Sequence, residues 1–305
     1  MSERTERRDS ENRTELAELI SSAGQSDGVV EPIAGIRLTR ASAPTDHIHA
    51  VAKPCFCVIA QGAKEVYLGE SVYRYDSKRY LLATIEVPLT GRIVEASKDR
   101  PYLAVRLEID PMMVGSAMVE AGLPTPTGHG EAKAVVVSLL DSGLLDTTVR
   151  LLRLLQSPAE SRVLLPIVRR ELVLRLLMGE QGIRLRHLPL HGGYSDNIAK
   201  AVDRLRNEYD QPLRIESLAK DLGMSSSGFH HHFKAVTDMS PLQFQKQIRL
   251  QQARRLMLGE NLDAASAGFR VGYDDASHFS RDYKRLFGNS PARDAERLRT
   301  MVAAD

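Results

Sequence analysis

The chain has 305 residues, 43% of them hydrophobic, which is enough for two domains that each bury a core. A formal net charge of +2 does not by itself identify a nucleic-acid-binding protein, and two cysteines exclude a disulfide framework. No stretch approaches the ~18 apolar residues of a membrane span, and the charged first ten residues lack the apolar run of a signal peptide. We therefore expect a cytoplasmic protein that does not enter a membrane.

The first 29 residues divide into a tail and a short helix. Residues 1–12 are almost all charged or polar, so we expect them to be disordered. Leu16, Leu19 and Ile20 are spaced to share one face of a helix over residues 14–22.

From residue 30 to residue 109 the pattern is that of short β-strands. Apolar and other residues alternate over 103–109, and Cys55 and Cys57 alternate with Phe56 and Val58. Gln61-Gly62-Ala63-Lys64 has the composition of a hairpin turn, and Thr90-Gly91 that of a second turn. Many short strands separated by turns predict a small β-barrel or jelly roll.

From residue 111 the pattern becomes helical. Helices are predicted over 112–121, 141–156 and 160–179, and one further strand over 134–140. Leucines form a wide stripe along the last two helices, which is typical of a face buried in a core. Residues 186–193 include one proline and two adjacent glycines, which indicates a linker.

The stretch 218–236 has the pattern of two helices separated by a tight turn. Gly223 can take the left-handed conformation that ends the first helix, and the Ser225 hydroxyl can cap the second. Phe229 and Phe233 then point inward, whereas the outward face carries Ser227, His230, His231 and Lys234. A helix-turn-helix of this kind places its second helix in the DNA major groove.

The same plan recurs about 50 residues later in the chain. Phe279, Tyr283 and Lys284 stand at a constant offset from Phe229, Phe233 and Lys234, and Ser290-Pro291 repeats Ser240-Pro241. Chance seldom repeats core residues, lysine and Ser-Pro together, so the sequence predicts two copies of one unit. Ser240 and Pro241 start a helix over 241–258 that connects the two copies.

Residues 194–300 resemble the DNA-binding domain of AraC/XylS-type transcription regulators. The residues that carry the resemblance are Gly223-Met224-Ser225, Phe233-Lys234, Ser240-Pro241, Arg249-Leu250 with Ala253 and Leu256, and the block from Val271 to Pro291. Segments 57–64, 73–76 and 88–103 resemble the N-terminal cupin-like domain of one AraC-type subgroup. The resemblance implies an α+β protein with a cupin-like β-barrel followed by helices over 30–190, and an all-α domain with two helix-turn-helix units over 194–300.

The resemblance also implies which side chains meet DNA. By motif position the base-reading candidates are Ser227, His230, His231, Ala276, Ser277, Ser280 and Arg281. Arg281 is the strongest of them, because a guanidinium can bind guanine O6 and N7 together; the alternative for Arg281 is a phosphate contact. The expected phosphate contacts are Lys234, Lys284 and Arg285. Local positive charge rests on Lys246, Arg249, Arg254, Arg255, Arg281, Lys284, Arg285 and Arg293.

One residue departs from the family pattern. The family often has an aromatic side chain where this chain has Asp294, and we expect the difference to affect only the last turn of the domain.

The expected function is sequence-specific transcription regulation, controlled by a small-molecule effector in the barrel. Expected partners are double-stranded DNA, a second copy of the chain through the helices after the barrel, and RNA polymerase if the protein is an activator. Two alternatives remain open: the barrel only dimerises, or Cys55 and Cys57 sense oxidants or electrophiles.

An enzyme is a distant alternative, since many cupins bind a catalytic metal. His47 and His49 share a strand face, but the glutamate of the usual cupin pattern does not follow. Consecutive helical residues point about 100° apart, so His230, His231 and His232 cannot meet at one ion. We expect no metal, no cofactor and no catalytic residue.

Overall fold

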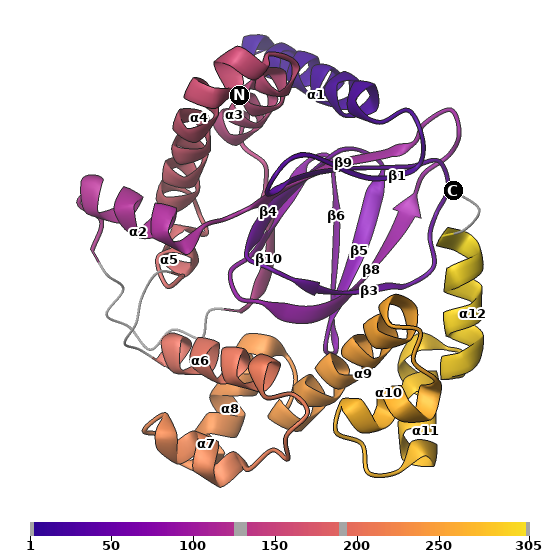
Figure 1. The fold of residues 1–305 in the computed structure, drawn as a ribbon. Helices are drawn as coiled ribbons and strands as arrows, with labels where there is room; N and C mark the ends of the chain where they lie inside the picture. The colour runs from indigo at the N-terminus through magenta and orange to yellow at the C-terminus, as the bar shows by residue number, and fades with distance from the viewer. Residues whose placement is uncertain (1–2, 125–132, 189–193, 303–305) are drawn as a thin grey trace.

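The computed structural model describes residues 3–124, 133–188 and 194–302 (Figure 1). Within these residues a β-barrel lies between a layer of N-terminal-domain helices and the helices of a C-terminal domain. This is the α+β arrangement that the sequence predicts. Within the same residues, no helix combines the length and the apolar composition needed to cross a bilayer.

The barrel is built from two antiparallel sheets. The larger sheet contains, in spatial order, β1 (Gly28–Ile33), β2 (Ile36–Ala41), β9 (Tyr102–Glu108), β4 (Cys55–Gln61), β7 (Arg79–Ala83) and β10 (Val135–Leu139). The smaller sheet contains β3 (Ile48–Ala52), β8 (Val87–Glu95), β5 (Ala63–Leu68) and β6 (Ser71–Asp76).

Two predicted turns in the barrel are wrong. Gln61–Lys64 is not a hairpin turn, because β4 and β5 belong to different sheets. The chain crosses between the sheets at Gly62, whose φ is +88°, and a Cβ there would lie 2.4 Å from the carbonyl oxygen of Glu95. Thr90 and Gly91 lie inside β8, where Gly91 leaves room for the Lys64 side chain.

The N-terminus forms one helix, α1 (Glu3–Ala23), rather than a disordered tail and a short helix. Leu16 and Ile20 are buried in the same core cluster as residues of the larger sheet, as their spacing predicts. The polar part is held by side chains of the facing helix: Arg8 pairs with Asp146 at 2.7 Å, and Asp9 accepts a hydrogen bond from the Ser142 hydroxyl at 2.8 Å. The charged residues at the start of α1 therefore reflect ion-pair and hydrogen-bond partners on the facing helix, and not disorder.

Apart from its exposed edge strand β1, the larger sheet is largely buried on both of its faces. Its outer face packs against α1 and a helical layer made of α2 (Pro111–Glu120), α3 (Ser142–Arg153) and α4 (Pro158–Met178), with the short α5 (Gly182–Leu185) beside them. Phe56, Val58 and Leu107 belong to this outer cluster, whereas Cys55 and Ile59 belong to the cluster inside the barrel.

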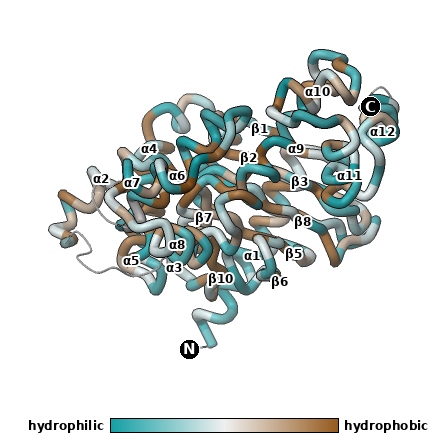
Figure 2. The backbone as a smooth tube through the Cα atoms, turned by 90° about the horizontal axis from the view of Figure 1, so that it is seen from below, coloured by the Kyte–Doolittle hydropathy of each residue, from teal (hydrophilic) through white to brown (hydrophobic). Residues whose placement is uncertain are grey.

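The C-terminal domain contains two helix-turn-helix units joined by one helix. The first unit is α6 (Tyr194–Asn207), α7 (Ile215–Asp221) and α8 (Ser226–Thr237), and the connecting helix is α9 (Pro241–Gly259). The second unit is α10 (Ala264–Arg270), α11 (Ala276–Phe287) and α12 (Pro291–Val302). In Figure 2 hydrophobic and hydrophilic residues alternate along these helices, as amphipathic packing requires.

Local sequence signals set the helix ends in this domain. Gly223 and Gly272 have φ values of +67° and +88° in the two turns, as the repeat predicts. Ser225 caps α8 by accepting from the amide of Gly228, and Ser240 caps α9 within a complete capping box. The inward residues of the two reading helices, Phe229, Phe233, Phe279 and Tyr283, have no exposed surface.

Asp294 is a buried junction of three helices, so its predicted restriction to the last turn is wrong. Its carboxylate lies in α12, is completely buried, and accepts from Arg254 of α9 at 2.7 Å and from the Tyr283 hydroxyl of α11 at 2.8 Å. Arg297 is a third donor, at 3.2 Å. Burial alone would raise the pKa of Asp294, but the hydrogen bonds from Arg254 and Tyr283 outweigh it and hold the pKa below its ordinary value.

The substitution Asp294→Asn should lower the free energy of unfolding by about 3 kcal/mol at neutral pH, because it leaves the Arg254 charge without its counter-ion. The folded pKa lies below the unfolded value of about 3.9, so the carboxylate stabilises the fold above that pH and the stabilisation is lost as pH falls. Urea unfolding at several pH values should show the difference from wild type shrinking below about pH 4. Glu296→Gln, at an exposed position of the same helix, is the control; equal stability of Asp294→Asn and wild type at pH 7 would contradict the assignment.

The first helix-turn-helix unit is docked on the barrel. Asp238, which ends α8 in the left-handed conformation, accepts from the backbone amides of Glu70 at 2.9 Å and Ser71 at 2.8 Å in the β5–β6 turn. Gly69 permits this approach, because a Cβ there would lie 2.0 Å from the carbonyl oxygen of Asp238. The amide of Ala134, just before β10, donates to the carbonyl of Val236 at 2.9 Å.

One further ion pair and a shared core join the domains. Arg206 of α6 pairs with Glu86 at 2.7 Å, beyond the end of β7. One cluster of buried apolar side chains includes both inward residues of the barrel, such as Val66 and Leu68, and core residues of the first unit, such as Phe233 and Val236. The first unit thus packs on the barrel as a continuous core.

The substitution Asp238→Gly should release the β5–β6 turn without straining the left-handed backbone, since glycine adopts that conformation freely. We expect hydrogen exchange at the Glu70 and Ser71 amides to accelerate at least about tenfold, because each loses a charge-assisted hydrogen bond. Asp238→Asn is the matched control, since asparagine keeps an acceptor oxygen and tolerates the left-handed region. Unchanged exchange in the glycine variant would show that the carboxylate does not hold the turn.

Candidate nucleic-acid interface

The outward face of α8 carries the side chains that the sequence predicts for it. Ser227, His230, His231 and Lys234 are exposed, whereas the intervening Phe229 and Phe233 are buried. His230, His231 and Lys234 line a hollow of about 580 Å³ that also includes Lys133 of the N-terminal domain. No pattern in the sequence singles out Lys133, which comes close to α8 through the docking of the two domains.

The outward face of α11 is the counterpart in the second unit. Ser277, Arg281 and Lys284 are exposed, and Ala276 and Ser280 are half-buried. Asp275 caps the helix by accepting from the amide of His278 at 2.6 Å, a position at a helix start where an acidic residue is favourable. Within the described part of the chain, Arg281 and Lys284 make no ion pair within 4.0 Å, which leaves their charges available to phosphate or base.

Arg285 belongs to a network around a buried acid. Asp282, only 3% exposed, pairs with Arg285, with Lys246 of α9 at 3.0 Å and with His278 at 3.4 Å. Burial opposes ionisation of Asp282, but Lys246 and the other cations hold its pKa below the ordinary value. The Arg285 side chain remains largely exposed, so an ion pair with Asp282 and a phosphate contact are both sterically open to it.

Eight Lys and Arg side chains were expected to provide local positive charge, and three of them instead bind other groups of the protein. Arg249 donates to the carbonyls of Tyr209 at 2.6 Å, Gly272 at 2.7 Å and Gln211 at 2.9 Å, which ties α9 to the α6–α7 loop and to the turn between α10 and α11. Arg254 is bound by Asp294, and Lys246 by Asp282. Arg255, Arg281, Lys284 and Arg293 are exposed. Fewer cations are therefore available to attract DNA than the sequence alone indicates.

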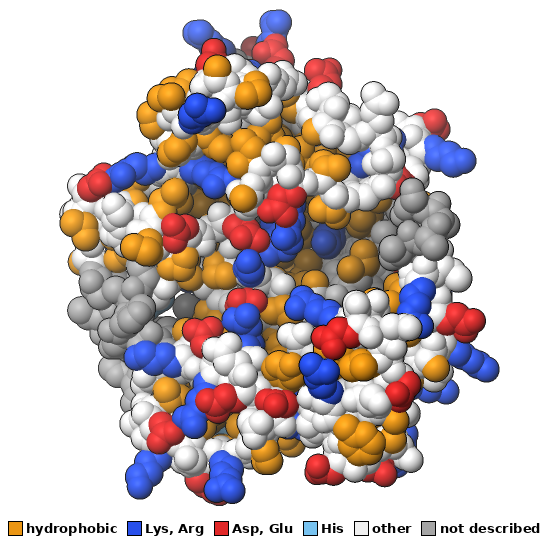
Figure 3. Space-filling view, viewed as in Figure 1, with side chains coloured by type: hydrophobic (Ala, Val, Ile, Leu, Met, Phe, Trp, Pro, Cys, Tyr) orange, Lys and Arg blue, Asp and Glu red, His pale blue; other side chains and the backbone are white. Residues whose placement is uncertain are grey.

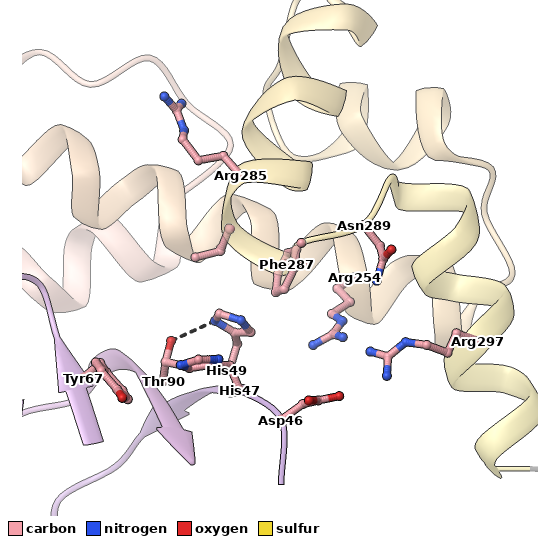
Figure 4. A pocket seen from close by; sticks show the side chains of 12 residues that line it. Asp46, His47, His49, Tyr67, Thr90, Arg254, Arg285, Phe287, Asn289 and Arg297 are labelled. Carbon is pink, nitrogen blue, oxygen red and sulfur yellow. Dashed lines mark hydrogen bonds between the residues drawn. The ribbon is translucent and has the colours of Figure 1, made fainter. Parts of the chain in front are cut away.

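A cleft of about 630 Å³ separates the second unit from the outer face of the smaller sheet (Figure 4). From the barrel side, His49 packs edge-on against Phe287 at 4.9 Å between ring centres and bonds the Thr90 hydroxyl at 2.8 Å. Burial, followed by the charge of Arg254, lowers the pKa of His49 to about 4. In Figure 4 Arg285 points away from His47 and Asp46, toward the outside of the domain.

Charge gathers along the junction of the two domains. Figure 3 shows Lys and Arg side chains around the hollow between the barrel and the C-terminal domain, interspersed with Asp and Glu. Interspersed signs are typical of a polar contact between domains that lacks a strong net field.

Cys55 and Cys57 point into the barrel with their sulfur atoms 3.8 Å apart, so both are free thiols on one strand face, as predicted. The hydrogen bond from Cys57, with Arg106 and Lys64 nearby, lowers the pKa of Cys55 to about 7, whereas the pKa of Cys57 is raised. Among the described residues, no group of three or more His, Cys, Asp or Glu side chains is placed to hold a metal ion.

Comparison with known proteins identifies both domains. Residues 32–184 match the family model described as AraC-type transcriptional regulator N-terminus, and residues 218–297 match a helix-turn-helix domain. The chain is 29% identical over 100 residues to the Msm operon regulatory protein of Streptococcus mutans, a stretch covering 33% of this chain and 35% of that protein. It is 30% identical over 95 residues to the MmsAB operon regulatory protein of Pseudomonas aeruginosa, covering 31% of each. The chain thus spans about a third of the length of the curated relatives it matches.

Solved structures resemble the whole described fold. ToxT of Vibrio cholerae with a bound naphthalenyl-butenoic acid has a TM-score of 0.58 at 12% identity, covering 85% of this chain and 97% of that one. ToxT with a bound unsaturated fatty acid has a TM-score of 0.55 at 11% identity, covering 87% and 96%. At such identities the likeness concerns the fold. Because the family model for the N-terminal domain matches half of the chain, the protein belongs to the family of AraC-type transcriptional regulators.

Proposed function

We propose that the protein is a sequence-specific DNA-binding transcription regulator whose barrel binds a small-molecule effector. The observation that carries the proposal is the pair of capped reading helices, α8 and α11, each with a buried aromatic face and an exposed polar face. The connecting helix α9, tied by Arg249 to the α6–α7 loop of the first unit and to the α10–α11 turn of the second, supports one fixed separation of the two units.

In this proposal α8 and α11 enter major-groove segments about 10 bp apart on one face of the duplex. Bases are read by Ser227, His230, His231, Ala276, Ser277, Ser280 and Arg281. Lys234, Lys284 and Arg285 contact phosphates and set the register without reading sequence. For Arg285 this requires exchanging the buried Asp282 for a phosphate or sharing its five donors between them.

The effector would act through the docking of the first unit. Because Asp238 and Val236 anchor the end of α8 to the barrel, a ligand that prefers one barrel shape also prefers one placement of α8. The small acids bound to ToxT support the idea that a fold of this kind can host an effector.

We further propose a cytoplasmic homodimer, with RNA polymerase as a partner if the protein is an activator. The α4 helix buries Leu165, Leu172 and Leu176 but leaves Val163 and Ile167 about 60% exposed, which supports a second role for the apolar stripe as an interface. In the alternative proposal the barrel serves only to dimerise, and the exposed apolar stripe supports that proposal equally. The alternative differs because it predicts that small molecules have no effect on DNA binding.

The substitution Arg281→Ala should reduce binding to promoter DNA from next to the protein's own gene by about tenfold, with the loss confined to one base position. The matched control is Lys284→Ala, one turn later, which should weaken all sequences alike and reduce the salt dependence by about one phosphate contact. Full-length protein titrated at two salt concentrations against single-base operator variants separates the two. Equal weakening on every sequence by Arg281→Ala would make that residue a phosphate contact.

A second candidate is a barrel that senses oxidants or electrophiles through its thiols. It is favoured by the 3.8 Å separation of the sulfur atoms and by the lowered pKa of Cys55, since the thiolate is the reactive form.

The double substitution Cys55→Ser, Cys57→Ser tests this candidate, and it should abolish the effect of hydrogen peroxide on promoter binding if thiols are the sensor. Binding that responds to peroxide equally in wild type and in the double variant would remove the candidate. Untreated samples of both proteins are the control for folding.

A further inference from the structure

The inner face of the barrel carries two cations. Lys64 lies on the same face of β5 as Val66 and Leu68, opposite Tyr75 and Ile93 in the two neighbouring strands. Arg106 lies on the same face of β9 as Tyr102 and Ala104, opposite Cys57. The two cations come from different sheets and face the same interior.

The Lys64 side chain crosses the inner face of β8. A Cβ added at Gly91 would lie 2.8 Å from Lys64 Cε and 3.2 Å from Nζ, so glycine makes the room for it. Lys64 and Arg106 are half-buried although they point inward, so the surrounding core does not cover either residue completely. Solvent removal lowers the pKa of Lys64, as expected for an ammonium group inside a barrel.

Neither cation has an acidic partner within 4.0 Å among the described residues. The carboxylate nearest to Arg106 along the strand, Glu108, is 3.8 Å from Lys53 and 4.0 Å from Arg37. Arg106 Nε and the hydroxyl of Tyr73, whose ring packs against the inner cluster, are buried without a hydrogen-bond partner. Unpaired buried donors are costly, and a native structure retains them where something else is to be bound.

The thiols do not cancel this charge. Cys55 can ionise near neutral pH, but the hydrogen bond with Cys55, burial and the charge on Cys55 raise the pKa of Cys57, so the pair supplies at most one negative charge. Two cations against one thiolate leave the interior positive.

We propose that the barrel interior binds a small organic acid, with its carboxylate between Lys64 Nζ and the Arg106 guanidinium and its apolar body against the inward side chains of the two sheets. The Tyr73 hydroxyl is a third donor to the ligand. The inference rests on the proposed role of the barrel as effector domain, and it names the chemical class of the effector.

A carboxylate fits this face better than a phosphate does. The paired N–H donors of the guanidinium can bind two oxygens of either anion, so the preference comes from the low net charge of the site and from its apolar surroundings. Ile59, Val66, Leu68 and Leu81 make the rest of the interior apolar, which suits a hydrocarbon body and not a multiply charged ion.

The test uses full-length protein in thermal-shift and calorimetric titrations with hexanoate and benzoate. Hexanamide and benzamide are the neutral counterparts, and inorganic phosphate is the competing anion. We expect the carboxylates to raise the melting temperature of wild type above the effect of their amides. Lys64→Met should lower carboxylate affinity at least about tenfold, the value of one charge-assisted hydrogen bond. Lys98→Met, at an exposed loop position, is the matched control and should bind as wild type.

Without ligand, Lys64→Met should melt at a higher temperature than wild type, because it removes a half-buried charge that has no acidic partner. Arg106→Met is the second variant and should likewise lose carboxylate affinity. If Arg106→Met does not fold, the affinity of Lys64→Met decides whether the site exists. Carboxylates that stabilise wild type no more than their amides, or that stabilise Lys64→Met fully, would overturn the site. Phosphate binding tighter than either acid would overturn the ligand class. The promoter-binding test with Arg281→Ala does not depend on any of these ligand-binding results. Failure of this ligand site and failure of the regulator proposal are therefore distinguishable.

Discussion

The structure depends on a single apolar core that the barrel shares with the first helix-turn-helix unit. One buried cluster contains Val66 and Leu68 from inside the barrel and Phe233 and Val236 from the unit. At the end of α8, the Asp238 carboxylate accepts a hydrogen bond from the β5–β6 turn. Packed cores switch between discrete arrangements and do not deform continuously. A change in the barrel would therefore either shift α8 to a second distinct position or have no effect on it. This constraint gives an effector in the barrel a mechanical route to DNA.

Two buried acids organise the second unit and decide which cations remain for DNA. Asp282 binds Lys246 and Arg285, and Asp294 binds Arg254 and Arg297. Where the family often places an aromatic side chain, Asp294 joins α9, α11 and α12 through a charge network instead. The second unit thereby holds its outward-facing helix α11 through hydrogen bonds of fixed geometry, whereas the first unit holds α8 mainly by apolar packing against α6, α7 and α9.

Local patterns in the sequence predicted the local structure well. Both turn glycines, the caps at Ser225, Ser240 and Asp275, and the inward aromatic residues follow from rules that act within a few residues. The helix over Glu3–Ala23 was only half predicted, because its polar part is fixed by Asp146 and Ser142, more than 130 positions away. Alternation along β9 separated two faces but did not tell the inside of the barrel from the outside, because both faces are largely buried, and Arg106 was therefore missed. Lys64 was missed because Gln61–Lys64 was predicted as a hairpin turn, whereas Lys64 lies in β5.

Hydrogen exchange of the full-length protein tests the central claim most directly, free and with promoter DNA, against unrelated DNA of equal length at the same salt. The account predicts that residues 226–237 and 276–287 both gain protection with promoter DNA beyond that given by unrelated DNA, because both reading helices enter the groove. Protection of neither helix, or protection confined to the barrel, would contradict it.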